Sequence, residues 1–176
     1  MVGYRTLSEN EICRELFHGF IRHQVVTKCR RWEEGGWVIR DDPFIDDWTE
    51  ADYQTLVSCL KNTAAAGGVV YGAFVAVVLK GFASVEPGAM GREGQYLDLS
   101  SIHVSEDMRG TGIGKALFSM AKGWARERGA KKLYISAHSA VESQAFYQKM
   151  GCVEALEYDR RHVELEPFDC QLECEL

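Results

Sequence analysis

Three glycines within five residues, Gly110, Gly112 and Gly114, constrain the fold of this chain more than any other feature. They follow a predicted strand, "QYLDLSSIHV", and they precede a predicted helix. The apolar residues of that helix fall on one face, at Ile113, Ala116, Leu117, Met120, Ala121 and Trp124. Glycine in such a loop costs backbone entropy, so the loop must adopt a conformation, or allow an approach, that a side chain would block. The stretch therefore predicts a strand–loop–helix unit at the centre of a layered fold.

The segments on either side extend this unit to an α/β (α+β) fold. Ser8 and Glu11 form a predicted capping box, which favours a helix carrying Ile12, Leu16 and Phe20. Thr49 is the predicted cap of a second helix. We expect a hairpin over 27–40 and strands over 68–78, 79–87, 95–104, 131–136, 152–158 and 168–174, with helices ending at Gly129 and Gly151. This order predicts a single domain, residues 1–176, with a mixed central sheet flanked by helices.

Composition and charge exclude several classes of protein. The net charge of −6 argues against a nucleic-acid partner. No stretch approaches the ~20 apolar residues of a membrane span, so we expect no membrane partner. The first residues do not resemble a secretory signal, which predicts a cytoplasmic protein with its six cysteines as free thiols. No cysteine pair has zinc-type spacing with histidine support, so no metal is expected.

The glycine loop can be compared with three phosphate-binding patterns. A P-loop would need a glycine at Arg109 and Ser or Thr at Ala116, so that pattern fails twice. The dinucleotide fingerprint fails because the glycines are spaced two and two. The third pattern, Arg/Gln-x-x-Gly-x-Gly/Ala, fits Arg109, Gly112 and Gly114. These residues resemble the pyrophosphate loop of the GNAT superfamily of acyl-CoA-dependent N-acetyltransferases, and a plain strand–helix turn without a ligand is the alternative.

The resemblance continues on both sides of the loop and is strongest over about 69–157. The strand Asp98 to Val104 resembles the family strand that carries a carboxylate and a bulge. Downstream, Phe146, Tyr147 and Gly151 match the helix with Phe-Tyr near its end. The family often has a cofactor-binding asparagine early in that helix. By spacing this position is Ala140, and Ser143 or Gln144 is the candidate substitute.

The resemblance implies acetyl-CoA as the acyl donor and assigns residues to hold it. The pyrophosphate would be held by the loop and the first helical turn, namely Arg109, Gly110, Thr111, Gly112, Ile113, Gly114 and Lys115. Backbone amides at a helix N-terminus and the helix dipole both favour an anion there. The backbone of Ile102, His103 and Val104 would pair with the pantetheine arm as an added strand, and the N–H of Ile102 would be an oxyanion donor.

Two side chains are the candidates for proton transfer. Asp98, at the position of the family carboxylate, would deprotonate the amine directly or through water; the alternative is a strand-edge salt bridge. Tyr147 would protonate the leaving thiolate; the alternative is a core aromatic. His103 on the same strand is more typical of a structural histidine than of a catalytic one.

The acceptor is left open by the sequence, although one segment suggests its charge. "RDDPFIDDWTEAD" gathers carboxylates, and Asp46 and Asp47 would form an acidic wall for a cationic acceptor; a solvated charged face is the alternative. We expect direct transfer of an acetyl group to a primary amine of a small molecule in a ternary complex. The competing functions are a non-catalytic CoA-binding sensor or regulatory domain and an enzyme using a longer acyl-CoA. The oligomeric state is open, a homodimer included.

Overall fold

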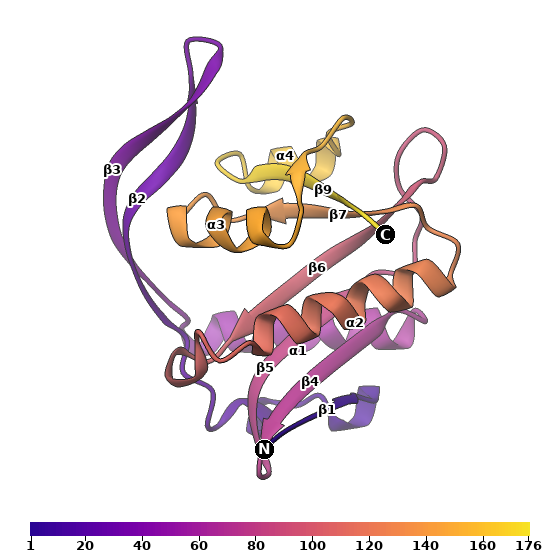
Figure 1. Cartoon of the computed structure of the whole chain (residues 1–176). Helices are drawn as coiled ribbons and strands as arrows, with labels where there is room; N and C mark the ends of the chain where they lie inside the picture. Colours follow the sequence, from indigo (N-terminus) through magenta and orange to yellow (C-terminus); the bar gives the residue numbers. More distant parts are fainter.

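A seven-stranded mixed sheet runs through the molecule in the order β1-β4-β5-β6-β7-β9-β8, and β2 and β3 form a separate two-stranded hairpin (Figure 1). The computed structural model describes all 176 residues. The strands are β1 (Val2–Thr6), β2 (His23–Glu33), β3 (Gly36–Asp47), β4 (Val69–Val75), β5 (Val78–Val85), β6 (Tyr96–Val104), β7 (Lys132–Ala137), β8 (Val153–Glu154) and β9 (Cys170–Glu175). The helices are α1 (Glu50–Ala65), α2 (Ile113–Glu127), α3 (Val141–Lys149) and α4 (Arg160–Leu165). The predicted mixed sheet flanked by helices is confirmed.

Each face of the sheet is covered by helices that bury one apolar side. On the larger face, α2 buries Ile113, Leu117, Phe118, Ala121, Trp124 and Ala125, which recur at helical spacing as the sequence predicts. Tyr147 of α3 joins this core. On the opposite face, Tyr53 and Leu60 of α1 pack with Phe82 of β5 in a smaller core. The sheet therefore separates two apolar layers. None of the helices combines the length and apolar character that a membrane crossing requires.

A bulge in β6 changes which of its side chains face each layer. The register between β5 and β6 shifts between Ser84 and Val85, so that Ser84 opposes Ser101 while Val85 opposes Leu99. Before the bulge, Leu97 and Leu99 enter the larger core, whereas after it Ile102 and Val104 pack there. An extra residue inverts the alternation of a strand. Asp98 before the bulge and His103 after it thus both lie on the smaller-core face.

β6 and β7 are the only parallel neighbours, and they separate soon after they begin. Their pairing comprises Tyr96 with Lys132, Leu97 with Leu133, and Asp98 with Tyr134. Beyond this point β6 continues against β5, and β7 continues against β9. The two strands therefore diverge at Asp98, and the edge of β6 from Leu99 onwards has no strand partner on the β7 side.

The β2–β3 hairpin contacts the segments that follow both diverging strands. At one end, the N–H of Ile21 donates to Ser105 Oγ (2.9 Å) and the N–H of Glu106 to Ile21 O (3.0 Å). Further along, the N–H of Arg30 donates to Ser139 O (2.8 Å), before α3. In Figure 1 the hairpin stands as a long arm beside the ends of β6 and β7. The predicted hairpin and the Thr49 cap of α1 are both confirmed.

The structure differs from the sequence predictions of secondary structure in four segments. The capping box at Ser8 and Glu11 is present, but it begins only a single 3₁₀ turn. A second 3₁₀ turn covers Arg14–Phe17, in place of the predicted α-helix. Packing of the apolar side chains against α1 and β5 decides this conformation. The strand β1 and the helix α4 were not predicted. The predicted strand over 152–158 is reduced to Val153–Glu154.

Candidate functional site

The glycine loop adopts the backbone conformation that its glycines allow. Gly110 has φ +76° and Gly112 has φ +91°, in the left-handed region that side chains disfavour. Thr111 Oγ1 donates to Met108 O (2.6 Å), which closes the turn. The Arg109 guanidinium donates to His23 O (2.6 Å) and thereby ties the loop to β2.

The N-terminus of α2 has the properties of an anion site. Gly112 is its N-cap and supplies no side-chain oxygen, and no acidic residue lies in the first turn. The first amides of a helix have no intrahelical acceptor, and the helix dipole favours negative charge there. Lys115 is exposed in the same turn. The residues present therefore fit the pyrophosphate of a coenzyme A.

Gly114 serves a different purpose from the two loop glycines. A Cβ at this position would lie 3.2 Å from Phe146 of α3, which is tighter than an ordinary van der Waals contact. Its role is therefore the close packing of α2 on α3, which brings the start of α2 close to the helix that carries Tyr147.

The end of β6 places its three predicted cofactor residues on an open strand edge. Ile102 opposes Ala83 of β5, and β7 does not pair with this part of β6. His103 packs between Trp48 and Phe82, with ring centroids 4.8 and 5.2 Å away. Burial, with the Arg22 guanidinium adding to it, lowers the pKa of His103 to about 3, so the imidazole is neutral. The neutral, buried side chain of His103 has a structural role in packing, whereas its backbone lies on the open edge of β6.

Tyr147 projects from α3 into the larger core with its hydroxyl unpaired. The ring is 8% exposed and packs against Phe118 and Phe146. No protein group hydrogen-bonds to the hydroxyl, and the hydroxyl is not among the fully buried atoms that lack a partner. Burial raises the pKa of Tyr147 above its ordinary value, so the phenol stays protonated and able to donate.

The start of α3 lacks a side-chain amide that is free to bind a ligand. Ala140, at the expected asparagine position, is fully buried and is the N-cap of α3. Gln144 is buried, and its Nε2 donates to His138 O (2.8 Å). Ser143 is partly buried, and its hydroxyl makes no hydrogen bond in the protein. Of the two candidate substitutes, Ser143 has a free hydroxyl, whereas the amide nitrogen of Gln144 is already bonded to the backbone.

Asp98 is a buried carboxylate with one engaged and one free oxygen. The residue is 2% exposed and is the last residue of β6 paired with β7. Its Oδ2 lies 2.8 Å from Nε2 of His162 on α4. Its Oδ1 is fully buried and has no hydrogen-bond partner. An unpaired buried oxygen is energetically costly, so a missing partner is expected at Oδ1.

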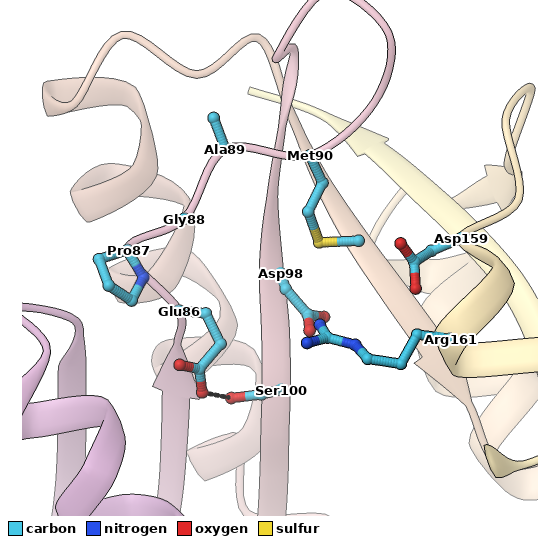
Figure 2. Close-up of a pocket in the computed structure, with 9 residues that line it drawn as sticks. All are labelled: Glu86, Pro87, Gly88, Ala89, Met90, Asp98, Ser100, Asp159 and Arg161. Carbon is cyan, nitrogen blue, oxygen red and sulfur yellow. Dashed lines mark hydrogen bonds between the residues drawn. The ribbon is translucent and has the colours of Figure 1, made fainter.

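A cavity of about 610 Å³ lies beside Asp98 on the smaller-core face of the sheet. Figure 2 shows the carboxylate of Asp98 among side chains from the β5–β6 connection and the start of α4. The lining residues are Glu86, Pro87, Gly88, Ala89, Met90, Asp98, Ser100, Asp159 and Arg161. The cavity thus holds three carboxylates against one guanidinium, at the point where β6 and β7 diverge.

The two lining carboxylates other than Asp98 are held by hydrogen bonds but not by ion pairs. Glu86 Oε1 accepts from Thr63 Oγ1 (2.6 Å) and Ser100 Oγ (2.8 Å). Asp159 Oδ1 accepts from the N–H of His162 and so caps α4. Neither carboxylate lies within ion-pair distance of Arg161 or of any other cationic side chain. The negative charges of Glu86 and Asp159 are therefore not offset by an ion pair.

Asp46 and Asp47 lie on β3 and do not line this cavity. Asp46 pairs with the Arg22 guanidinium, and its Oδ2 is 3.9 Å from His138 Nε2. Asp47 Oδ1 is 2.7 Å from His23 Nδ1. Both carboxylates already have partners. The structure does not bring them together with Asp98, and the acidic wall stays a prediction.

Sequence reasoning missed four residues around Asp98: Glu86, Asp159, Arg161 and His162. Three of them belong to the α4 segment, which carries no clear periodicity and was not predicted to be a helix. His162 stands 64 residues after Asp98 in the chain. No spacing rule connects them, and only the dense "DRRH" stretch marks the segment as unusual.

Comparison with known proteins is consistent with this arrangement. The family model described as "Acetyltransferase (GNAT) family" matches residues 24–152. A nourseothricin acetyltransferase structure is 21% identical, with a TM-score of 0.67, over 98% of this chain and 95% of its own. A Bacillus anthracis protein assigned as a streptothricin acetyltransferase, solved with acetyl coenzyme A, is 16% identical, with a TM-score of 0.73, over 100% of both chains.

A third structure has the same fold. The PaiA N-acetyltransferase of Thermoplasma acidophilum, solved with coenzyme A, is 14% identical, with a TM-score of 0.62, over 100% of this chain and 99% of its own. At these identities the structural likeness establishes the fold alone. No curated protein sequence shows a significant match to the chain.

Proposed function

The chain belongs to the GNAT family of acetyltransferases, and on this basis we propose that it transfers an acetyl group from acetyl-CoA to a primary amine of a cationic small molecule. The observation that carries the proposal is Asp98, a buried carboxylate that lines an acidic cavity at the divergence of β6 and β7 and has one oxygen, Oδ1, without a partner. An ammonium group is the natural partner for such an oxygen.

The donor would be held by elements whose geometry suits each part of it. The first turn of α2, with the left-handed Gly110 and Gly112, would bind the pyrophosphate through backbone amides. The open edge of β6 at Ile102, His103 and Val104 would pair with the amides of the pantetheine arm. When bound, acetyl-CoA supplies the acetyl group as a thioester.

The protons would be handled by two residues on opposite faces of the sheet. Asp98 accepts the proton of the ammonium, which frees the amine lone pair for attack. Tyr147 keeps its proton because burial raises its pKa, and its free hydroxyl then protonates the departing thiolate. The N–H of Ile102 would stabilise the charge that develops on the carbonyl oxygen.

The charge of the cavity supports a cationic acceptor. Asp98, Glu86 and Asp159 are three carboxylates, and Arg161 is the one guanidinium that lines the cavity with them. The ammonium group at Asp98 would offset only one of these negative charges, and a second cationic group on the acceptor would offset another. Arg161 would favour an acceptor that also carries an oxygen-rich group. Diamines and amino-acid-like amines meet these conditions, so they form the first acceptor class to test.

The test is acetyl-CoA turnover against an amine panel, with the acetylated product measured by mass spectrometry. The panel pairs polyamines and lysine-like amines with neutral and anionic amines of equal size and with hydroxyl analogues. Nourseothricin and streptothricin belong in it because two similar structures are named for them. We expect turnover of cationic amines that Asp98→Asn abolishes. Coenzyme A binding without any turnover would favour the sensor alternative.

A further inference from the structure

His162 and Asp98 form a pair that joins α4 to the middle of the sheet. Nε2 of His162 lies 2.8 Å from Oδ2 of Asp98, and the two side chains are 18% and 3% exposed. A neutral imidazole carries one N–H, and an ionised carboxylate can only accept. Nε2–H therefore donates to Oδ2, and in the neutral ring Nδ1 is left without a proton.

The ring is fixed by contacts that do not involve Asp98. It stacks on the ring of Tyr134 at 5.6 Å with an interplanar angle of 25°. The Tyr134 hydroxyl accepts from the N–H of Asp159 (2.9 Å), and the Asp159 carboxylate accepts from the N–H of His162 (3.0 Å). The position of His162 is therefore determined by β7 and by the cap of α4.

The two oxygens of Asp98 have different surroundings as a result. Oδ2 is held by His162, while Oδ1 is buried without a partner in a residue that lines the cavity. Nδ1 of His162 has no protein partner either, but it is not among the fully buried unpartnered atoms, so it retains contact with water. The pair thus links an unpartnered oxygen of a cavity-lining residue to a nitrogen in contact with water.

Charged and titratable groups surround the pair on every element packed against it. They are Asp98 of β6, Tyr134 of β7, Asp169 before β9, and Asp159 and Arg161 at the start of α4. The hydrogen bond that His162 donates to Asp98 is the largest influence, and it raises the pKa of His162 against the opposing effect of burial.

We propose that His162 is a positioning residue that holds Oδ2 of Asp98, leaves Oδ1 available to the ammonium group of the acceptor, and makes the Asp98–His162 pair the acceptor of the substrate proton. This inference rests on the proposed function. The bound ammonium loses one N–H bond; its proton forms an O–H bond at Oδ1, and the electron pair stays on nitrogen as the attacking lone pair. The carboxylate becomes a neutral acid and later returns the proton to water.

The state of His162 determines how well Asp98 performs this step. When the ring is an imidazolium, its charge stabilises the ionised carboxylate, and Asp98 is a weaker proton acceptor. When the ring is neutral, the hydrogen bond remains and that extra stabilisation is gone. Activity should therefore fall as the pH drops through the raised pKa of His162.

The pair itself can be tested without any substrate. The imidazole nitrogens of ¹⁵N-labelled protein are followed by NMR as the pH is varied, in the wild type, in Asp98→Asn and in His18→Gln. The last is a matched control, because His18 is exposed on a 3₁₀ turn. We expect a lower pKa of His162 in Asp98→Asn and an unchanged one in His18→Gln. An equal pKa of His162 in the wild type and Asp98→Asn overturns the inference.

The catalytic part is tested by kcat/KM for the best cationic amine between pH 5 and pH 10. His162→Gln keeps a donor to Oδ2 but does not titrate, so its acidic limb should move to lower pH. His162→Leu removes the donor and should lose about 10- to 100-fold in kcat, with the KM for acetyl-CoA unchanged.

The outcomes separate this inference from the proposed function. If the wild-type protein acetylates no amine, the proposed function fails and the catalytic role of His162 fails with it. If the wild type is active and His162→Gln retains the wild-type acidic limb, only the inference about His162 is overturned. A purely structural tether of α4 would lower thermal stability in His162→Leu without moving that limb in His162→Gln.

Discussion

Replacing Gly112 by alanine should weaken coenzyme A binding much more than an equally strained change elsewhere on the same helix. Gly112 and Gly129 flank α2 at its two ends, with φ +91° and φ +80°. In both positions an added Cβ would meet nothing within 4 Å, so neither substitution creates a clash. The pair therefore isolates the conformational strain, and Gly129→Ala is the matched control.

The expected loss of stability is similar for the two variants. An L-residue in the left-handed region costs about 1–2 kcal/mol. For a chain of this size, each kcal/mol lowers Tm by about 2–4 °C. Thermal unfolding should therefore show a decrease of a few degrees in both variants, with the folded state retained.

The expected loss of affinity differs between them. Strain at Gly112 is relieved by turning the backbone amides at the start of α2 away from the pyrophosphate. A hydrogen bond to a charged group contributes about 1.5–3 kcal/mol, and the loss of one corresponds to at least a tenfold weaker Kd. Titration calorimetry with coenzyme A should show this for Gly112→Ala, while Gly129→Ala binds as the wild type does. Equal affinities in the two variants would refute the assignment of the loop.

Three further predictions follow from individual side chains. Tyr147→Phe should lower kcat by about 10²–10⁴-fold with coenzyme A affinity and Tm almost unchanged, since the hydroxyl has no protein partner; kinetics and calorimetry check this. Glu86→Gln with Asp159→Asn should raise the acceptor KM and flatten its dependence on salt, because screening acts over about 8 Å at physiological ionic strength; a salt dependence equal to that of the wild type would contradict it. Burial works to raise the pKa of Glu173, but hydrogen bonds, chiefly from Lys132, hold it below its ordinary value. This stabilisation is present above the unfolded pKa of about 4.3 and is lost as the pH falls further, so the Tm advantage of the wild type over Glu173→Gln should shrink in acid.

Local rules were sufficient where neighbouring residues determine the conformation. The hairpin turn follows from glycines between two β-rich runs, although it lies at Glu34 and Gly35, both at positive φ, and not at the expected Gly35 and Gly36. The cap at Thr49 and the ends of α2 and α3 at glycines follow from the orphan groups of helix termini. The same rules misassigned the segment after Ser8, because its apolar residues fit an α-helix and two 3₁₀ turns equally well, and packing against α1 decided between them.

The order of residues along the chain by itself determined the conformation of the glycine loop that we propose for the pyrophosphate. Its arginine, its glycines and the first turn of α2 are contiguous, so their geometry follows from backbone conformation alone. The partner of Asp98 was decided only by the tertiary structure. The divergence of β6 and β7, the bulge that sets the face of β6, and the docking of α4 on Tyr134 together bring His162 to within 2.8 Å of a carboxylate 64 residues away. Contacts over such separations depend on how the elements pack, and no periodicity or spacing in the sequence encodes them.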